Sequence, residues 1–354
     1  MNQPDAPAAF AWITQPSTNA VAGVAFATQP KLTLYDRWQN LISGATVVAQ
    51  ANIGAVGVLQ GTTTLQSVDG QVTFTDLAHP AAEILKLRIT SGNAVAISQE
   101  ITVVPGPVAT VSAVGGTPQG TRPGAEFALP LIAKVADAYG NGIAGATVKF
   151  EASGSQASAS FPHGDTVVTD AYGQASVVAQ ANSFLGSHIV TAKATQYPQL
   201  AAAVFQLLNF SKLQEWRFEN FSIWEDTGDA ADAATPFNDG VANLLKYALN
   251  MNPKAPDHGQ MSANGAGGLP IVVLDAEGRL TVTFVRRKVS TLPGVSYQVQ
   301  FSNDVDGSFV ENPSAITSTP VSIDAIWERV TVTDSVAASD STPKRFTRLQ
   351  VAEL

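Results

Sequence analysis

Alternating apolar and polar residues recur along the first two thirds of the chain. Segments such as Lys31–Tyr35 and Ser187–Thr191 alternate apolar with polar side chains, which is the pattern of a strand with one buried face. Turn-forming pairs such as Asp69-Gly70 and Tyr172-Gly173 separate these segments. About seven such strands in ~100 residues, without helical periodicity, predict antiparallel β-sandwiches.

The first 208 residues contain a sequence repeat. Residues 35–47 align with residues 136–148 at an offset of 101, and residues 69–71 pair with residues 172–174 after a two-residue slip. A period near 100 residues indicates whole duplicated domains rather than a solenoid. We therefore predict one domain over residues 1–105 and a second over residues 106–208. The two prolines in the seam between them predict a short, semi-rigid linker.

The second copy carries a specific family resemblance. Its segments Asp137–Phe150, Thr169–Ala175 and Gly186–Ala192 resemble bacterial Ig-like domains of the invasin/intimin repeat type, and the match covers most of residues 106–208. The first copy departs from the pattern, because Trp38-Gln39 replaces the Gly-rich turn. The resemblance implies Ig-like spacer domains that lift a binding tip off the outer membrane of a bacterium.

The turn at the start of this motif has a physical reason. Asp137 and Asn141 can cap a tight loop through side chain to backbone hydrogen bonds, and the glycines between and after them tolerate positive φ. Loops at the ends of sandwiches are where such folds place recognition. We therefore predict Trp38 and its counterpart Tyr139 as contacts with a partner.

After residue 208 the apolar period changes from 2 to about 3.6. The apolar stripe from Leu213 to Trp224 predicts a short helix or turn, and Val241–Leu249 predicts a firmer helix that Asn252-Pro253 ends. Strands return beyond a Gly-rich linker, at residues 280–284, 295–302, 327–333 and 345–351. The predicted fold is mostly β: two tandem Ig-like β-sandwiches plus a C-terminal module over 209–354, with a short helical segment at 210–255 and a β-sandwich at 268–354.

The segment Asn238–Pro253 is similar to the degenerate calcium loops of thrombospondin-type-3-like and dockerin-like proteins, in the version found near the C-termini of large secreted bacterial proteins. The similarity covers most of residues 215–352. A calcium loop places oxygen ligands at positions 1, 3, 5, 9 and 12, with Gly at position 6. If Gly240 is position 6, Phe237 and Lys246 fall at positions 3 and 12, where neither can bind the ion.

Calcium is therefore a weak expectation, and no other cofactor is expected. Its candidate ligands are the oxygen-bearing side chains in and near this loop: Asp226, Asp229, Asp232, Asp239 and Asn243. The alternative is that Asp239 caps a helix beginning near Gly240, where a negative charge stabilises the helix N-terminus.

Composition excludes several classes of protein. Hydrophobic residues make up 45% of 354 residues, with 28 Gly and 20 Pro, so cores can form between many turns. Only 14% are charged, against about 25% in typical domains. A net charge of −9 argues against nucleic-acid binding, and no apolar run reaches the ~20 residues of a membrane span. Without cysteine there are no disulfides or thiolate metal sites.

The charges are unevenly placed. Seven acidic residues lie between Glu215 and Asp239, against Arg217 alone. Basic residues gather on the later strands, at Arg286, Arg287, Lys288, Lys344, Arg345 and Arg348. These groups are either complementary patches between subunits, or charges that face one another within the module and keep its edge strands soluble.

Aromatic residues offer a second kind of surface. Five tryptophans could form a platform for a sugar: Trp12, Trp38, Trp216, Trp224 and Trp327. The apolar neighbours of the last three assign them to cores, so Trp38 is the main candidate.

Catalysis has little support. The histidines are scattered and have no metal-ligand spacing, with His188 expected to face outward on its strand. There is no nucleophile elbow and no phosphate-binding loop. We expect no catalytic residues and no enzyme.

These observations favour a non-enzymatic structural or adhesion protein, extracellular or at the bacterial cell surface. Its expected partners are other protein subunits or a host or cell-surface ligand, with a glycan as a further option. One alternative is a filament subunit joined by head-to-tail or donated-strand contacts, the extended start at residues 4–10 being the donated arm. Another is a carbohydrate-binding accessory region of a larger secreted enzyme.

Overall fold

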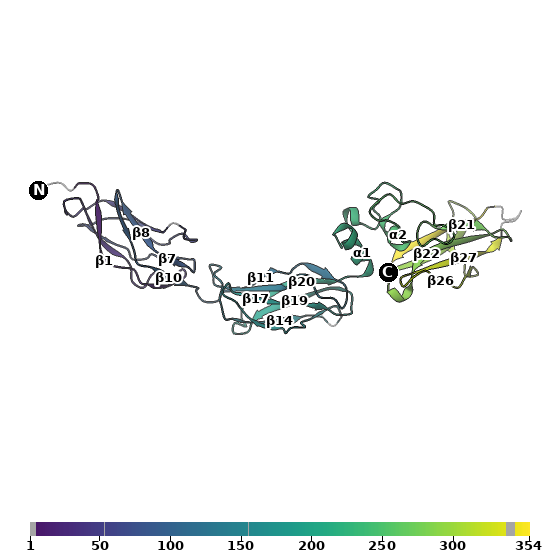
Figure 1. Ribbon diagram of the computed structural model, residues 1–354, viewed down its shortest axis with the longest axis horizontal. Helices are drawn as coiled ribbons and strands as arrows, with labels where there is room; N and C mark the ends of the chain where they lie inside the picture. Colours follow the sequence, from purple (N-terminus) through teal and green to yellow (C-terminus); the bar gives the residue numbers. More distant parts are fainter. Residues whose placement is uncertain (1–4, 53, 155, 338–343) are drawn as a thin grey trace. The chain divides into compact units, whose positions relative to one another are not determined.

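The structure is a computed structural model that describes residues 5–52, 54–154, 156–337 and 344–354 (Figure 1). The chain forms two compact units. The first unit consists of Met1–Gln119, Glu126–Gln180 and His188–Leu207, and the second of Gly120–Ala125, Ala181–Ser187 and Leu208–Leu354. The second repeat thus contributes to both units, and the predicted domain limits at residues 105 and 208 stay a prediction.

The first sandwich lies wholly in the first unit. The bounds of its strands are β1 (Ala9–Thr14), β2 (Asn19–Val21), β3 (Lys31–Tyr35), β4 (Thr46–Ala51), β5 (Thr64–Gln66), β6 (Gln71–Thr73), β7 (Ile84–Leu85), β8 (Leu87–Ser91), β9 (Ala94–Ile97) and β10 (Ile101–Val104). They form sheets of order β1-β3-β6, β2-β10-β7 and β5-β4-β8-β9. The apolar core between these sheets includes Leu32, Leu34, Leu87 and Ile89, all inaccessible to solvent.

The second sandwich has a similar plan. Its strands are β11 (Thr110–Gly115), β12 (Gln119–Thr121), β13 (Leu131–Ala136), β14 (Thr147–Ala152), β15 (Ala159–Ser160), β16 (Thr166–Val168), β17 (Gln174–Val177), β18 (Gln180–Ala181), β19 (Gly186–Ala194) and β20 (Ala203–Asn209). The sheet orders are β11-β13-β17, β12-β20-β19-β14-β16 and β15-β18.

The sequence repeat is also a structural repeat. Strands β11 and β14 begin and end 101 residues after β1 and β4. The sheets β1-β3-β6 and β11-β13-β17 have the same order. Both first strands also shift register at the same place, between Trp12 and Thr14 and between Ala113 and Gly115. The two copies therefore share topology as well as motif.

Alternation along the strands builds these cores. In β20 the side chains of Ala203, Phe205 and Leu207 are buried and those between them are more accessible, and each large apolar side chain buried in this way contributes about 1.5–3 kcal/mol. The expectation for His188 was wrong. It falls on the buried face of β19, where its ring lies 6.2 Å from that of Phe127.

The C-terminal module begins with a short helical segment, α1 (Lys212–Phe221), η1 (Gly228–Ala230) and α2 (Asn243–Ala248). Helix α1 starts with a capping box, in which Ser211 Oγ accepts from Gln214 N and Gln214 Oε1 accepts from Ser211 N. Helix α2 is shorter than the predicted Val241–Leu249. Its N-cap is Ala242, without a side-chain cap, so the expectation that Asp239 caps a helix was wrong.

Two sheets complete the module. The remaining elements are β21 (Ile271–Leu274), β22 (Arg279–Arg287), η2 (Val289–Thr291), β23 (Val295–Ser302), β24 (Val310–Glu311), β25 (Ile316–Thr317), β26 (Val321–Ser322), β27 (Trp327–Ala337) and β28 (Phe346–Glu353). One sheet has the order β21-β22-β27-β25, with β26 also on β27, and the other has the order β24-β23-β28. The four predicted strands are thus present, the last beginning one residue later than expected.

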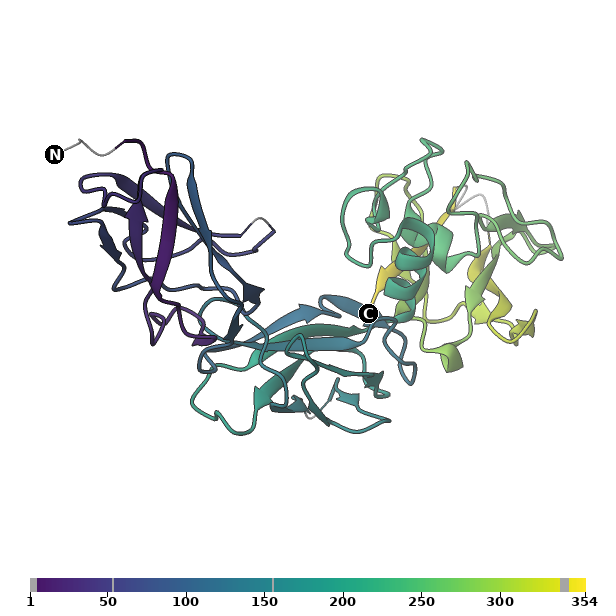
Figure 2. The same cartoon turned by 60° about the vertical axis from the view of Figure 1, so that its left-hand side comes forward.

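The module has an apolar core on each side of the sheet that contains β23. Phe284 and Val330 of one sheet pack against Val299 and Phe301 of the other. Leu213 of α1 and Tyr247 of α2 pack with residues of β23 and β28, so the helices cover that sheet (Figure 2). None of the helices in the described ranges has the length and apolar character needed to cross a membrane.

Candidate functional site

The motif loop of the second sandwich, residues 137–141, is here called the joint loop. The carboxylate of Asp137 is almost inaccessible and accepts four hydrogen bonds, from Tyr139 N, Asn141 N, Asn141 Nδ2 and Gly106 N, at 2.8–3.0 Å. Burial alone would raise the pKa of Asp137, but the bonds from Asn141 and from these backbone groups hold it below its ordinary value. Gly140 takes the positive φ of 85° that the turn requires.

The joint loop binds the first sandwich, within the same compact unit. Asn141 Nδ2 donates to Pro80 O at 2.8 Å, and Asn141 Oδ1 accepts from Ala82 N at 2.9 Å. The ring of Tyr139 packs against Gly23, since a Cβ there would lie 2.0 Å from Tyr139 Cε2. Tyr139, predicted as a partner contact, therefore contacts the preceding sandwich of its own chain.

The equivalent loop of the first sandwich, residues 36–40, is here called the proximal loop. Asp36 is as deeply buried as Asp137 and accepts from Trp38 N, Asn40 N, Asn40 Nδ2 and Asp5 N at 2.8–3.1 Å. Burial raises the pKa of Asp36, but the Asn40 side chain and the backbone donors outweigh it and lower the pKa to about 2. Gln39 adopts a φ of 69°, so the turn forms without its glycine.

Trp38 projects from this loop and is 69% exposed. The guanidinium of Arg37 lies 5.0 Å from the centre of its ring and also pairs with Asp5 at 2.9 Å. The other tryptophans contribute to packing: Trp12 to the first core, Trp216 and Trp224 to ring contacts around α1, and Trp327 to the C-terminal sheets. Trp38 is thus the exposed tryptophan of the described chain.

The candidate calcium ligands do not converge, and the protein's own cations pair with three of them. Lys246 Nζ lies 2.6 Å from Asp239 Oδ2, both side chains being buried. This bond, with that from Asp257 N, holds the pKa of Asp239 well below its ordinary value. Asp232 and Asp226 face Arg217, at 2.6 and 3.7 Å.

The other two candidates have different roles. Asn243 Nδ2 donates to the carbonyls of Asp229 and Ala231, at 2.8 and 3.0 Å, and so holds the loop after α1. Asp229 itself is exposed. No metal-binding group of three or more His, Cys, Asp or Glu occurs within the described ranges. The residues do not fit a calcium ion, because the ammonium of Lys246 already lies against the loop carboxylate.

A partly buried cation joins the helices to the sheets. The guanidinium of Arg287 lies between two rings, 3.9 Å from the centre of Tyr247 and 4.5 Å from that of Trp327. Its Nε donates to Tyr247 O at 3.2 Å. Burial lowers the pKa of Arg287 and raises the pKa of Tyr247 to about 12. The basic residue thus acts through packing rather than as a surface charge.

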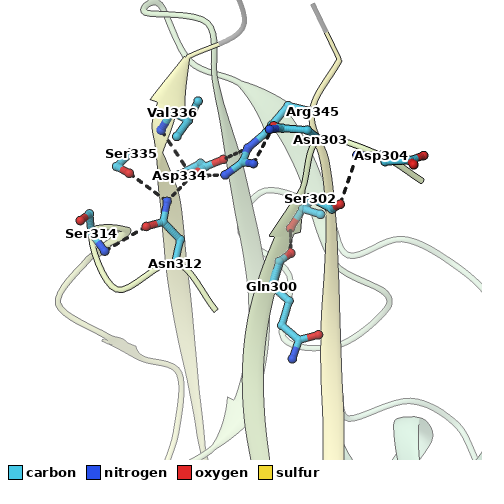
Figure 3. A network of polar contacts seen from close by, with 11 residues as sticks. Gln300, Ser302, Asn303, Asp304, Asn312, Ser314, Asp334, Ser335, Val336 and Arg345 are labelled. Atoms are coloured by element: carbon cyan, nitrogen blue, oxygen red, sulfur yellow. Dashed lines mark hydrogen bonds and ion pairs between the residues drawn. The ribbon is translucent and has the colours of Figure 1, made fainter. Parts of the chain in front are cut away.

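A buried carboxylate joins the two C-terminal sheets (Figure 3). Asp334 of β27 accepts from Arg345 Nε at 2.5 Å and from Asn312 Nδ2 at 2.6 Å. Arg345 Nη1 also donates to Asn303 Oδ1 at 2.9 Å. Burial raises the pKa of Asp334, but the Arg345 and Asn312 side chains hold it below its ordinary value.

The ion pairs of the module favour internal pairing over complementary patches between subunits. The acidic segment pairs with Arg217 and Lys246, while Arg286 pairs with Glu328 and Arg345 with Asp334. Sequence reasoning missed these partners, because Glu328 lies 42 residues from Arg286 and no local pattern pairs Asp334 with Arg345.

One histidine lies beside a carboxylate. His79 is inaccessible, and its Nε2 is 2.7 Å from Glu83 Oε1. The same carboxylate accepts from Val56 N and Gly57 N. Burial raises the pKa of Glu83, and the bonds from His79 and the two amides lower it overall. The pair fastens a loop of the first sandwich.

The comparisons with known proteins find similar structures only. No family model matches the sequence, and no curated protein matches it. The Escherichia coli adhesin FdeC is 15% identical with a TM-score of 0.34, the match covering 98% of each chain. Invasin, a bacterial integrin-binding protein, is 16% identical with a TM-score of 0.29, over 97% of this chain and 56% of its own.

The surface-layer protein SbsC, domains 4–9, is 10% identical with a TM-score of 0.27, over 99% of this chain and 47% of its own. The chain therefore spans about half the length of the invasin and SbsC structures. The resemblance of the C-terminal segment to calcium loops is not confirmed by these comparisons.

Proposed function

We propose that the chain is a non-enzymatic structural and adhesion protein, extracellular or at a bacterial cell surface, in which the two Ig-like sandwiches are a stiff spacer. The observation that carries this is the joint loop. One side chain, Asn141, both donates to and accepts from the backbone of the first sandwich, while Asp137 fixes Asn141 and the linker together.

Such a joint resists bending for a physical reason. A hydrogen bond to a charged group contributes about 1.5–3 kcal/mol, and the linker amide of Gly106 is bound to Asp137 in this way. Because the loop is braced on both sides of the linker, a change of angle between the sandwiches breaks several bonds at once. A spacer that holds a ligand-binding end at a fixed distance needs this property.

The chain has no cysteine, which allows a direct test of stiffness. Ala11 and Ser112 are exposed and occupy equivalent positions on β1 and β11. Spin labels on A11C and S112C of the full chain should give a narrow distance distribution by pulsed electron paramagnetic resonance. Asn141→Ala should broaden it, and a broad distribution in the unsubstituted joint would contradict the spacer.

A matched pair of glycine variants isolates the contact with Tyr139. Gly23→Ala and Gly124→Ala impose the same strain, at φ of 72° and 78°, but only the added Cβ at Gly23 would meet a neighbour within 4 Å. Gly23→Ala should broaden the distance distribution and Gly124→Ala should leave it narrow. Equal effects of the two variants would show that Tyr139 does not brace the joint.

Adhesion is tested separately. Microspheres coated with the full chain should bind cultured epithelial cells above the level of microspheres coated with the heat-denatured chain. Equal binding of the two kinds of microsphere would contradict the adhesive part of the proposal but not the spacer function.

A filament subunit is a second candidate, favoured by one sheet edge. Strand β21 lies at the end of its sheet, and Val272, Val273 and Leu274 are each 45–59% exposed, which suits strand addition. The N-terminal arm is a weaker candidate for the donated strand. Residue 4 lies outside the described residues, and from Ala9 onward the segment is β1, which pairs with β3 of its own sandwich. Polymers in negative-stain micrographs that Val273→Lys abolishes would support the filament, and monomers would count against it.

A further inference from the structure

The aspartate of the proximal loop accepts the same four hydrogen bonds as the aspartate of the joint loop. Asp5 N donates to Asp36 as Gly106 N does to Asp137, and each donor precedes its acceptor by 31 residues. The chain then enters each sandwich in the same way, with Ala8 N donating to Tyr35 O and Ala109 N to Ala136 O, both at 2.9 Å.

The two loops differ in what their outward groups contact. In the joint loop, Asn141 binds Pro80 O and Ala82 N, and Tyr139 covers Gly23. In the proximal loop, Asn40 and Trp38 hold the corresponding positions. Within the described ranges, Asn40 Nδ2 has only Asp36 as its bonded partner and Asn40 Oδ1 has none. Trp38 is 69% exposed, against 49% for Tyr139.

We propose that the proximal loop is a docking surface for the end of another Ig-like sandwich, with Trp38 and Asn40 as its contact residues. The partner must present what the first sandwich presents to the joint loop. This is a carbonyl and an amide two residues apart, which Asn40 binds, and a glycine at positive φ, which leaves room for the ring of Trp38. The inference rests on the proposed spacer function, because it extends the same joint by one sandwich.

The loop is already shaped for this contact. Asp36 fixes the Asn40 amide through Nδ2, so that its oxygen is oriented before a partner arrives. Arg37, held by Asp5, lies over the indole of Trp38. Groups held in their bound geometry lose less entropy on association.

The test adds a sandwich ahead of the full chain. A second copy of residues 5–105 is fused directly before Asp5, so that its Pro80, Ala82 and Gly23 can reach the proximal loop of the original copy. Spin labels are placed on A11C of both copies. The distance distribution should be narrow and should match that of the A11C/S112C pair in the unextended chain.

Trp38→Ala and Asn40→Ala in the original copy should each abolish the narrow distribution. Both residues are exposed, and a cooperative thermal transition in each variant would show that it folds. A broad distribution that neither variant alters overturns the proposal. If the distance distribution is narrow for the A11C/S112C pair but broad for the two A11C labels of the extended chain, the docking proposal is wrong and the spacer function is still supported. If both are broad, the spacer function itself fails.

A glycan array with the unextended chain supplies the competing outcome. Binding of a glycan that is lost in Trp38→Ala would assign the loop to a sugar and overturn docking of a sandwich. No binding across the array, together with the narrow distribution in the extended chain, supports the proposal.

Discussion

The paired sandwiches and the C-terminal module stabilise buried carboxylates in different ways. Asp36 and Asp137 each accept four N–H groups, and no cation lies at ion-pair distance from either in the described chain. Asp239 and Asp334 instead face Lys246 and Arg345, at 2.6 and 2.5 Å. The N–H donors come mostly from the same short loop, whereas Arg345 lies just before β28, outside the strand that carries Asp334. The module should therefore be the more sensitive of the two to loss of a single charge.

The largest effect is expected from Arg345→Met. It leaves the carboxylate of Asp334, which is inaccessible to solvent, without its cation, and breaking a buried pair in this way costs about 3–5 kcal/mol. Urea unfolding of the full chain should show this loss in the transition of the C-terminal module. Arg348→Met is the control, since Arg348 is exposed and hydrogen-bonds Gln300. Equal losses in the two variants would contradict the buried pair.

A smaller loss is expected from Arg287→Leu. The substitution keeps an apolar side chain between the rings of Tyr247 and Trp327 but removes the cation, and a desolvated cation–π contact is worth about 2 kcal/mol. Unfolding followed by tryptophan fluorescence measures this loss of stability. The stability of Arg287→Lys should lie between that of the wild type and that of Arg287→Leu, because an ammonium keeps the charge without the planar stacking. A leucine variant as stable as the wild type would show that the cation of Arg287 does not stabilise its packing between the two rings.

The sequence could predict the features that depend on local pattern, but not the contacts between distant segments. The strands and the capped turn at Asp137 depend on local pattern and on residues within five positions of one another, so both are readable in the chain. The same reasoning missed the joint, because Pro80 and Ala82 give no signal in sequence that Asn141 will bind their backbone. It also expected only that Lys246 cannot bind calcium, and could not show that its ammonium binds the loop carboxylate.

Acid should affect the sandwiches through Asp36. Its folded pKa of about 2 is below the ordinary value of 3.8, so its contribution to stability is fully present above pH 4 and is lost as the pH falls towards 2. Calorimetric melts of the full chain should show the midpoint of the first sandwich falling over this window. Asp36→Asn should flatten that dependence, and an unchanged slope in the variant would exclude Asp36 as its source.

The two turns can be compared by exchanging one residue. Gln39→Gly should stabilise the first sandwich by about 0.5 kcal/mol, because relief of roughly 1–2 kcal/mol of left-handed strain exceeds the roughly 0.5–1 kcal/mol of entropy that glycine costs. Gly140→Gln should destabilise the second sandwich by a similar amount, since a Cβ there meets nothing within 4 Å and the positive φ is then the main cost. Urea midpoints measure both, and a destabilised Gln39→Gly would show that the glutamine side chain has a contact of its own.

The smallest effect is expected from calcium. A loop that binds the ion needs its carboxylates unpaired, but Asp239 is bound to Lys246 at 2.6 Å and Asp232 to Arg217 at the same distance. A cation entering this loop would have to displace an ammonium that is already desolvated, which leaves that ammonium buried without a counter-ion. Exchange of EGTA for calcium should therefore leave the calorimetric midpoint of the C-terminal module unchanged. A rise of several degrees would show that the ion competes with Lys246, and Lys246→Met would then increase the rise, because it removes the competitor while the carboxylate remains.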